Sequence, residues 1–301
     1  MRSATLIAIV LSTAAAYAIG RFDFRYRNVL DAATFLPLMI PQIILGLALL
    51  LFLKNFGLVG NLWGLSLALA REGWAVGLAA RTEGALREVE AEIRGQGGIA
   101  AALPCDVSSR AAVHRAVDAC RRTLGPVDLL VANAGISENT RPEGLDAEGV
   151  ERMLRVNFLG AVYAVEAVLP EMLARGSGHL VAVSSLAGHG GLPLTAGYSA
   201  SKAAMTAFFE SLRLDLRARG VAVTVVTPGY VRTPMTERNA HGMAFLVEPD
   251  VAVRRMMKGI RRRARNVAFP LPLALLTRVA RAFPRGLYDA LASRARREKR
   301  E

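Results

Sequence analysis

A tyrosine and a lysine one helical turn apart are the residues that most directly indicate chemistry in this sequence. In Tyr198-Ser-Ala-Ser-Lys202 the spacing places a phenol and an ammonium on the same face of a helix. An unperturbed tyrosine titrates near pH 10, so it can act as a general acid or base at neutral pH only if a neighbouring cation stabilises the phenolate. Ser185 lies thirteen residues upstream of Tyr198, at the end of an apolar run, where its hydroxyl could hold a carbonyl oxygen. The three residues predict a proton-transfer site for a carbonyl or an alcohol.

Apolar strand-like runs alternate with longer helical segments from about residue 75 onward. Strands are predicted at 75–80, 99–103, 127–132, 179–184 and 221–227. Helices are predicted at 83–94, 108–124, 147–174 and 200–219. Strands that alternate with helices favour an α/β fold with a doubly wound parallel sheet, whose ligands lie beyond the carboxyl ends of the strands. Ser185 falls at such an end.

These residues, taken in order along the chain, resemble the landmarks of one enzyme family. Ser185, Tyr198 and Lys202, with Asn133-Ala-Gly135 upstream and Pro228-Gly229 downstream, occur in the order typical of the short-chain dehydrogenase/reductase family. The resemblance extends over about residues 65–270 and implies a Rossmann-like fold. It also implies hydride transfer between a nicotinamide cofactor and an alcohol or ketone, with Tyr198 as the general acid or base.

The same resemblance implies roles for residues outside the proton-transfer group. Asn157, in a predicted helix where asparagine is unfavourable, resembles the asparagine that holds a water for the proton relay behind Lys202. Asp106 resembles the aspartate that contacts adenine, and it could also cap the helix that follows. The other residues expected to contact the cofactor are Val107, Asn133, Ala134, Gly135, Pro228, Gly229, Val231 and Thr233, together with Tyr198 and Lys202.

Arg81, at the end of a predicted strand, bears on the choice of cofactor. A carboxylate at this position would accept hydrogen bonds from the ribose hydroxyls of NAD. A guanidinium would instead bind a 2′-phosphate through bidentate, charge-assisted bonds. The sequence therefore favours NADP over NAD, with a surface arginine in a loop as the alternative.

The glycine-rich phosphate loop of the family is missing. At the family's spacing, counted back from Ala70, the three glycine positions fall on Phe56, Gly60 and Leu62. Only Gly60 matches, and the other nearby glycines have the wrong spacing for a tight turn and a close backbone approach to pyrophosphate. We therefore expect weak nucleotide binding, and a catalytically impaired fusion protein is the alternative to an active enzyme.

The first sixty residues differ in character from the rest of the chain. They contain two uncharged runs, at 3–20 and 32–53, each close to the length of a transmembrane helix. Residues 1–65 resemble a fragment of the permease subunits of binding-protein-dependent (ABC) transporters, so a transporter component is a further alternative. The arginines between the two runs favour a cytoplasmic connection, and two full spans would then place the remainder outside. The run 47–53 could instead form the central strand of the sheet.

The carboxyl-terminal part of the chain is both basic and apolar. The protein has a formal net charge of +13, a pI near 10.7 and 52% hydrophobic residues. Basic residues between 254 and 300 interleave with apolar ones, which suits a monotopic segment on anionic lipid. Nucleic-acid binding is the alternative explanation of the charge, but no nucleic-acid-binding motif is present.

The two cysteines and four histidines lack metal-ligand spacing, so no metal site is expected.

These features predict three regions. A hydrophobic, membrane-like helical segment covers 1–60, a Rossmann-type domain covers 61–270 and a basic amphipathic tail covers 271–301. We expect an NADP-dependent oxidoreductase of a lipophilic alcohol or ketone, associated with the bacterial inner membrane and with its catalytic domain facing the cytoplasm. The expected partners are a small-molecule substrate and the membrane surface, not nucleic acid. The sequence leaves open whether the protein forms a homo-oligomer.

Overall fold

A computed structural model describes residues 61–233, 236, 243, 245–282, 286 and 289. The chain divides into two compact units, Met1–Phe56 and Gly57–Glu301, and every described residue belongs to the second unit. The expected membrane spans, the permease-like segment up to residue 60 and the predicted cofactor residue Gly60 lie outside the described residues.

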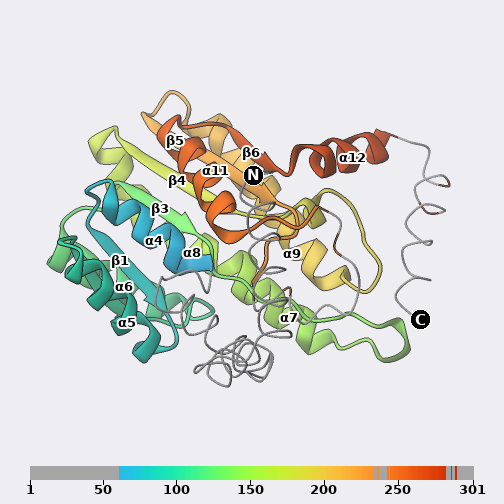
Figure 1. Cartoon of the computed structure of the whole chain (residues 1–301), viewed down its shortest axis with the longest axis horizontal. Coiled ribbons are helices and arrows are strands. Elements are labelled where there is room, and N and C mark those ends of the chain that lie inside the picture. Colours follow the sequence, from blue (N-terminus) through green and yellow to red (C-terminus); the bar gives the residue numbers. More distant parts are fainter. Residues whose placement is uncertain are drawn as a thin grey trace, which may run out of the picture. The chain divides into compact units, whose positions relative to one another are not determined.

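The described chain alternates helices and strands (Figure 1). In chain order the elements are α4 (Asn61–Arg71), β1 (Val76–Ala80), α5 (Glu83–Gly95), β2 (Ala100–Pro104), α6 (Arg110–Leu124), β3 (Leu129–Ala132), η1 (Pro142–Gly144), α7 (Ala147–Leu154), the π turn η2 (Arg155–Leu159), α8 (Gly160–Arg175), β4 (Gly178–Val183), η3 (Leu186–His189), α9 (Ala196–Leu216), β5 (Val221–Pro228), α11 (Pro249–Arg261), β6 (Asn266–Phe269) and α12 (Leu271–Ala282).

Local sequence accounts for several helix boundaries. Ser109 caps α6, because its hydroxyl accepts a hydrogen bond from the Ala112 N–H at 3.3 Å. Asp146 caps α7 in the same way, through the Gly149 N–H at 2.9 Å. α8 ends at Gly176, whose left-handed φ of 60° a glycine adopts without steric cost.

All of the described strand pairs are parallel, but they form two sheets. β1 pairs with β2, and the second sheet has the order β3-β4-β5-β6. Within the described residues no strand joins β1 to β3, so the single doubly wound sheet that the sequence predicts is found as two parallel sheets. The candidate central strand at 47–53 lies outside the described part of the chain.

The α/β class and every predicted strand and helix between residues 75 and 219 are confirmed, with boundaries shifted by a few residues. The elements that the prediction missed include α11 and β6. β6 is only four residues long and follows a run of arginines, so its sequence lacks the alternating pattern of an ordinary strand.

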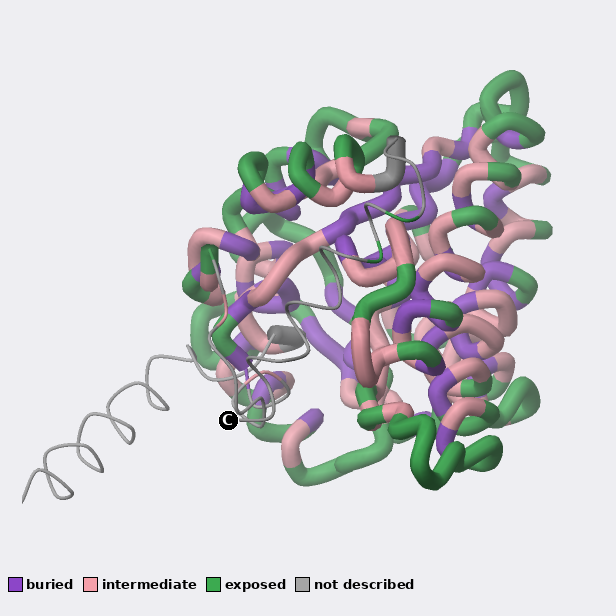
Figure 2. Tube along the Cα trace, turned by 90° about the vertical axis from the view of Figure 1, so that its right-hand side faces the viewer, coloured by how far each residue is buried: buried purple, intermediate pink, exposed green. Residues whose placement is uncertain are grey.

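Buried residues concentrate along the strands and the inward faces of the helices (Figure 2). Among the described residues one helix, Ala147–Arg175, is long and apolar enough to cross a membrane. Its Val168 and Met172 are buried in a core cluster with Leu180 of β4. This packing assigns the helix to the core of the domain.

Candidate active site

The structure brings the four predicted catalytic side chains together at the carboxyl edge of the larger sheet. Ser185 follows β4, Tyr198 and Lys202 lie in the first turns of α9, and Asn157 lies in the π turn η2. Ser185 hydrogen-bonds Tyr198, and Lys202 lies beside the Tyr198 ring. The residues that the spacing argument selects therefore lie together in the structure, and their role in proton transfer stays a prediction.

Lys202 is almost completely buried next to Tyr198. Its Nζ lies 5.9 Å from the centroid of the Tyr198 ring and donates a hydrogen bond to the Val183 carbonyl oxygen at 2.8 Å. The residue is only 4% exposed, so little water reaches its ammonium group. Lys202 thus places a positive charge near the phenol, in the interior of the protein.

Burial dominates the protonation of both groups. Desolvation raises the pKa of Tyr198, and the hydrogen bond with Ser185 opposes this increase. Desolvation also lowers the pKa of Lys202 from 10.5 to about 8. The expected lowering of the Tyr198 pKa by Lys202 is not found, because the desolvation of the phenol outweighs the opposing effect of Ser185. At neutral pH the phenol therefore keeps its proton.

Ser185 starts the short 3-10 turn η3. Its Oγ accepts a hydrogen bond from the Ala187 N–H at 3.1 Å and donates to the Pro228 carbonyl oxygen at 3.5 Å. The turn lies very close to α9, since a Cβ on Gly188 would lie 2.9 Å from the Lys202 carbonyl carbon. The glycine lets η3 hold Ser185 against the helix that carries Tyr198.

Asn157 is completely buried and connects two elements of the site. Its Nδ2 donates to the Ile136 carbonyl and to the Ser201 Oγ, both at 2.9 Å, and its Oδ1 accepts from the Ile136 N–H at 2.7 Å. Ser201 in turn donates to the Tyr198 carbonyl at 2.8 Å. Asn157 therefore positions α9 against the loop after β3, and its water-holding role stays a prediction.

Two buried serines of this network were missed by the sequence reading. Ser201 links Asn157 to α9, and Ser184 Oγ donates to the Lys202 carbonyl at 2.9 Å. A serine on the inner side of a helix, or at the end of a buried strand, needs a hydrogen-bond partner. That requirement is the only signal in the sequence that could have found them.

Arg81 and Asp106 follow the adjacent strands β1 and β2, and both are exposed. The Ser108 N–H and hydroxyl donate to the Asp106 carboxylate at 2.9 and 2.7 Å, and these bonds hold its pKa below the ordinary value. The attraction of Arg81 acts in the same direction. Asp106 thus holds the turn before α6, but the cap of that helix is Ser109 and not Asp106 as expected, and the contact of Asp106 with adenine stays a prediction. Arg81 makes no hydrogen bond or ion pair with another described residue.

The loop after β3 lies against the catalytic group, and the loop after β2 lies against α8. A Cβ on Gly135 would lie 3.4 Å from both the Asn157 Oδ1 and the Lys202 Nζ. A Cβ on Gly160 would lie 3.0 Å from the Val107 carbonyl oxygen. Gly160 thus permits a close approach of the loop after β2 to α8, whereas a Cβ on Gly135 would make only ordinary van der Waals contact with the catalytic group.

The loop after β5 is held in place by its backbone. The Gly229 N–H donates to the Phe269 carbonyl at 2.7 Å, and Val231 forms an isolated parallel bridge with Val247. The Thr233 N–H donates to the Thr236 Oγ1 at 2.9 Å. Pro228 ends β5 beside Ser185. The expected nicotinamide contacts of these residues stay predictions.

A cavity of about 590 Å³ is lined by both sheets. Its walls include the facing strands β1 and β3. Its lining also includes five of the predicted cofactor residues, which are Arg81, Val107, Asn133, Ala134 and Gly135. The predicted adenine end and the loop after β3 therefore share one cavity, beside the catalytic group.

The described residues fit the two ends of a dinucleotide. Arg81 offers a cation for a phosphate at one end, and Tyr198 with Lys202 offers a proton-transfer group at the other. The pyrophosphate would need a glycine-rich turn before α4, and the described start of α4 carries Leu62 and Trp63.

The described residues contain no group of three His, Cys, Asp or Glu side chains that could hold a metal ion.

Comparison with known proteins identifies the family. The model of the short chain dehydrogenase family matches residues 64–244, which is more than half of the chain. The chain belongs to the short-chain dehydrogenase family. An uncharacterised oxidoreductase of Myxococcus xanthus (strain DK1622) is 43% identical to it over 233 residues, which cover 77% of this chain and 92% of that protein.

More distant relatives and a solved structure agree with this assignment. Estradiol 17-beta-dehydrogenase 11 of Pongo abelii is 30% identical over 202 residues, covering 66% of this chain and 67% of that protein. A crystal structure from Burkholderia xenovorans, described as a short-chain dehydrogenase/reductase, superposes with a TM-score of 0.63 and 26% identity, over 70% of this chain and 88% of that one. The expected family, its Rossmann-like fold and oxidoreductase relatives are therefore confirmed, whereas the transporter resemblance stays a prediction.

Proposed function

We propose that this short-chain dehydrogenase uses NADP(H) to interconvert a lipophilic ketone and its alcohol, with Tyr198 as the proton donor or acceptor. The observation that carries the proposal is the hydrogen-bonded pair Ser185 and Tyr198 with the buried Lys202 alongside. A phenol paired with a hydroxyl, and a cation 5.9 Å from the centroid of the phenol ring, match the needs of carbonyl reduction.

Each side chain has a defined task in the reduction direction. Tyr198 donates its proton to the carbonyl oxygen of the substrate, and Ser185 donates a hydrogen bond to the same oxygen. The raised pKa of Tyr198 keeps the phenol protonated at neutral pH, which is the form that a proton donor requires. Lys202 stabilises the phenolate that remains. The cofactor, when bound, supplies the hydride.

NADP is favoured over NAD by the charge at the end of β1. Arg81 is exposed, lines the shared cavity and makes no ion pair with another described residue. Its guanidinium is therefore available to a 2′-phosphate, whereas the residue directly after β1 is not a carboxylate that could accept from ribose hydroxyls.

A lipophilic substrate is supported by the surroundings of Ser185 and by relatives. Leu186 and Leu273 approach the Gly229 loop next to Ser185, since a Cβ on Gly229 would lie 3.4 and 2.8 Å from their side chains. Two relatives are named for estradiol and for 17-beta-hydroxysteroids. We place the catalytic domain on the cytoplasmic side of the bacterial inner membrane, where NADP(H) is present.

A second candidate is a family member whose nucleotide binding is impaired. Two observations favour this candidate. Among the described residues no strand lies between β1 and β3, and position 62 carries a leucine where the family's phosphate loop has a glycine. A weak phosphate site would leave the catalytic group intact but rarely supplied with cofactor.

The substitution Tyr198→Phe tests the proposed activity. The assay follows NADPH oxidation with 2-decanone and a panel of other aliphatic and aromatic ketones, and Tyr163→Phe on α8 is the matched control. Loss of one proton-transfer group should lower the rate by about 10²–10⁴-fold with an unchanged circular dichroism spectrum. Activity within a few-fold of the parent would remove Tyr198 from the mechanism.

A further inference from the structure

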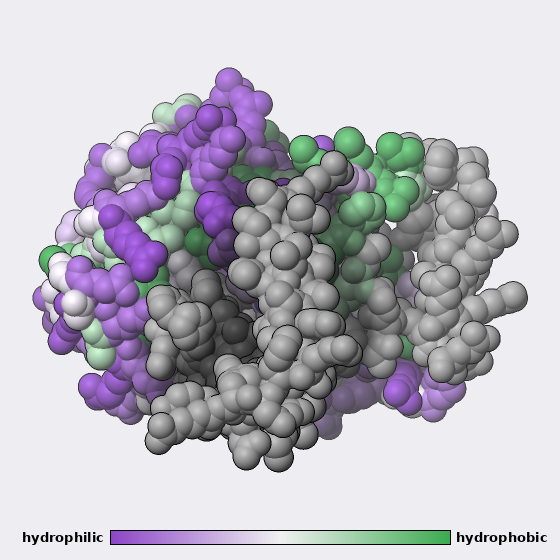
Figure 3. Space-filling view, in the orientation of Figure 1, coloured by the Kyte–Doolittle hydropathy of each residue, from purple (hydrophilic) through white to green (hydrophobic). Residues whose placement is uncertain are grey.

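The outer face of α12 exposes a row of large apolar side chains. Leu271, Leu275 and Val279 recur every fourth residue, and Leu276 lies next to them, so all four share one face of the helix. They are 67%, 58%, 52% and 59% exposed, respectively. These four, hereafter the α12 apolar face, are four of the ten large hydrophobic residues exposed in the described chain. Figure 3 shows the apolar surface over α12.

The opposite face of α12 is fixed to the active-site region. Ala274 is buried, and Leu273 packs at Gly229, next to the loop after β5. The Thr277 Oγ1 lies 3.4 Å from the His189 Nδ1 of η3, the turn that begins at Ser185. The α12 apolar face is therefore presented by a helix whose other side borders the catalytic turn.

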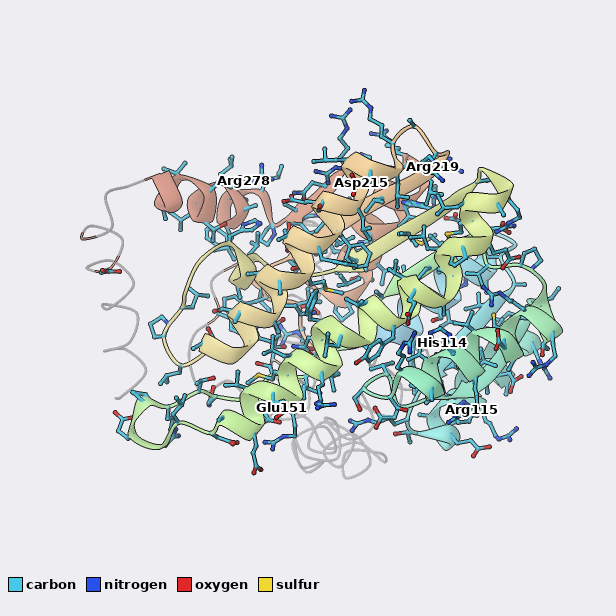
Figure 4. The ribbon with its side chains drawn as sticks, turned by 180° about the vertical axis from the view of Figure 1, so that it is seen from behind. His114, Arg115, Glu151, Asp215, Arg219 and Arg278 are labelled. Atoms are coloured by element: carbon cyan, nitrogen blue, oxygen red, sulfur yellow. The ribbon has the colours of Figure 1, made fainter. Side chains whose placement is uncertain are left out.

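The charges near the α12 apolar face are positive. Arg278 is exposed on α12, apart from Asp215 and Arg219 near the end of α9 (Figure 4). α12 contains Arg278 and Arg281 but no Asp or Glu. From Leu271 to Glu301 the sequence has eight Lys and Arg residues against three Asp and Glu residues.

We propose that the α12 apolar face docks on an anionic lipid bilayer. Its exposed apolar area suits the boundary between headgroups and acyl chains, and its arginines suit anionic headgroups. A symmetric contact with a second copy is disfavoured, because α12 carries no Asp or Glu that could pair with the arginines of a second α12. The docking goes beyond the proposed redox activity and does not rest on it.

Docking through α12 has a consequence for substrate access. Because the inner face of α12 contacts η3 and the Gly229 loop, bilayer contact would bring the surroundings of Ser185 close to the lipid surface. A lipophilic substrate dissolved in the membrane would then have a short path to the site.

The test uses the full chain and measures whether α12 itself enters the bilayer. Leu275→Cys and, as the matched control, Leu214→Cys on α9 are labelled with an environment-sensitive nitrobenzoxadiazole dye. Leu214 is 74% exposed, so both positions start in water. The unsubstituted chain gives the background from Cys105 and Cys120. The labelled proteins are mixed with vesicles of phosphatidylcholine, with and without phosphatidylglycerol, some carrying lipid-attached nitroxide quenchers.

The expected result is a blue shift and nitroxide quenching at residue 275 with phosphatidylglycerol vesicles, and neither at residue 214. Attachment through any other segment would not by itself place residue 275 within the bilayer. Arg278→Gln should raise the vesicle concentration for half-maximal shift by about fivefold, the effect of one cation near an anionic surface.

Three results would overturn the proposal. One is the absence of quenching at residue 275 with vesicles that bind the protein. Another is an equal response to pure phosphatidylcholine, and the third is a shift without lipid that grows with protein concentration, which would mark a contact between copies. None of these measurements depends on cofactor or turnover, so failure here would leave the proposed activity untouched.

Discussion

Replacing Lys202 with methionine should make the protein more stable at neutral pH while removing its activity. Lys202 is 4% exposed and its pKa is lowered by desolvation to about 8. Between pH 8 and 10.5 the unfolded chain binds more protons at this residue than the folded chain does, so stability rises with pH across this window. Below pH 8 the folded protein bears the full cost of the buried charge.

The size of the effect follows from the pKa difference. A change from 10.5 to about 8, at 1.36 kcal/mol per pKa unit, corresponds to a cost of about 3 kcal/mol at pH 7. Lys202→Met keeps a flexible side chain of similar length but loses the bond to the Val183 carbonyl at 2.8 Å, which is worth about 1 kcal/mol or more. We therefore expect a net gain of about 1–2 kcal/mol at pH 7 that disappears near pH 10.

The assay is urea unfolding at pH 7 and pH 9.5, followed by the fluorescence of the two tryptophans, Trp63 and Trp74, in a mild nonionic detergent. The matched control is Lys258→Met, which removes an exposed lysine from α11 and should change stability by no more than about 0.5 kcal/mol at either pH. A loss of stability in Lys202→Met at pH 7, or a difference from the parent that is the same at both pH values, would refute the reasoning.

Three further predictions concern the cofactor site and the buried network. Arg81→Asp should reverse the preference for NADPH over NADH, with a change of about 10–100-fold in relative affinity by calorimetry, because it exchanges a phosphate partner for a ribose partner. Replacing residues 47–63 with a strand and a Gly-x-x-x-Gly-x-Gly loop should tighten NADPH binding tenfold or more, since bare backbone would then approach the pyrophosphate. Asn157→Ala should lower the free energy of unfolding by about 2–4 kcal/mol, because it removes the partners of the part-buried Ile136 backbone groups and of the buried Ser201 hydroxyl.

Each of these predictions has a clear contrary result. Equal affinities for the two nucleotides before and after the Arg81 change would exclude that residue from the site. A micromolar or tighter affinity of the unaltered chain for NADPH would show that its present phosphate region is functional. An Asn157→Ala protein as stable as the parent would mean that the hydrogen bonds of this residue contribute little.

The order of the elements could be predicted from the sequence because their signals are local. Apolar runs such as 179–184 and helix signals such as the Ser109 cap act within one element. The i, i+4 spacing of Tyr198 and Lys202 is likewise a property of one helix, so the pair could be identified before any tertiary structure was known. β6 has no comparable signal, because its four residues become a strand only by pairing with β5.

The sequence by itself determined the chemistry of this protein: which residues carry the phenol, the ammonium, the hydroxyl and the guanidinium, and that the glycine-rich loop is absent. Only the tertiary structure decided how these groups behave. It buried Lys202 and shifted its pKa, joined Asn157 to Ser201 across 44 residues, and placed the strands of the described residues in two sheets. The physical reason is that desolvation and buried hydrogen bonds depend on which distant residues surround a group, and that information is not contained in local spacing.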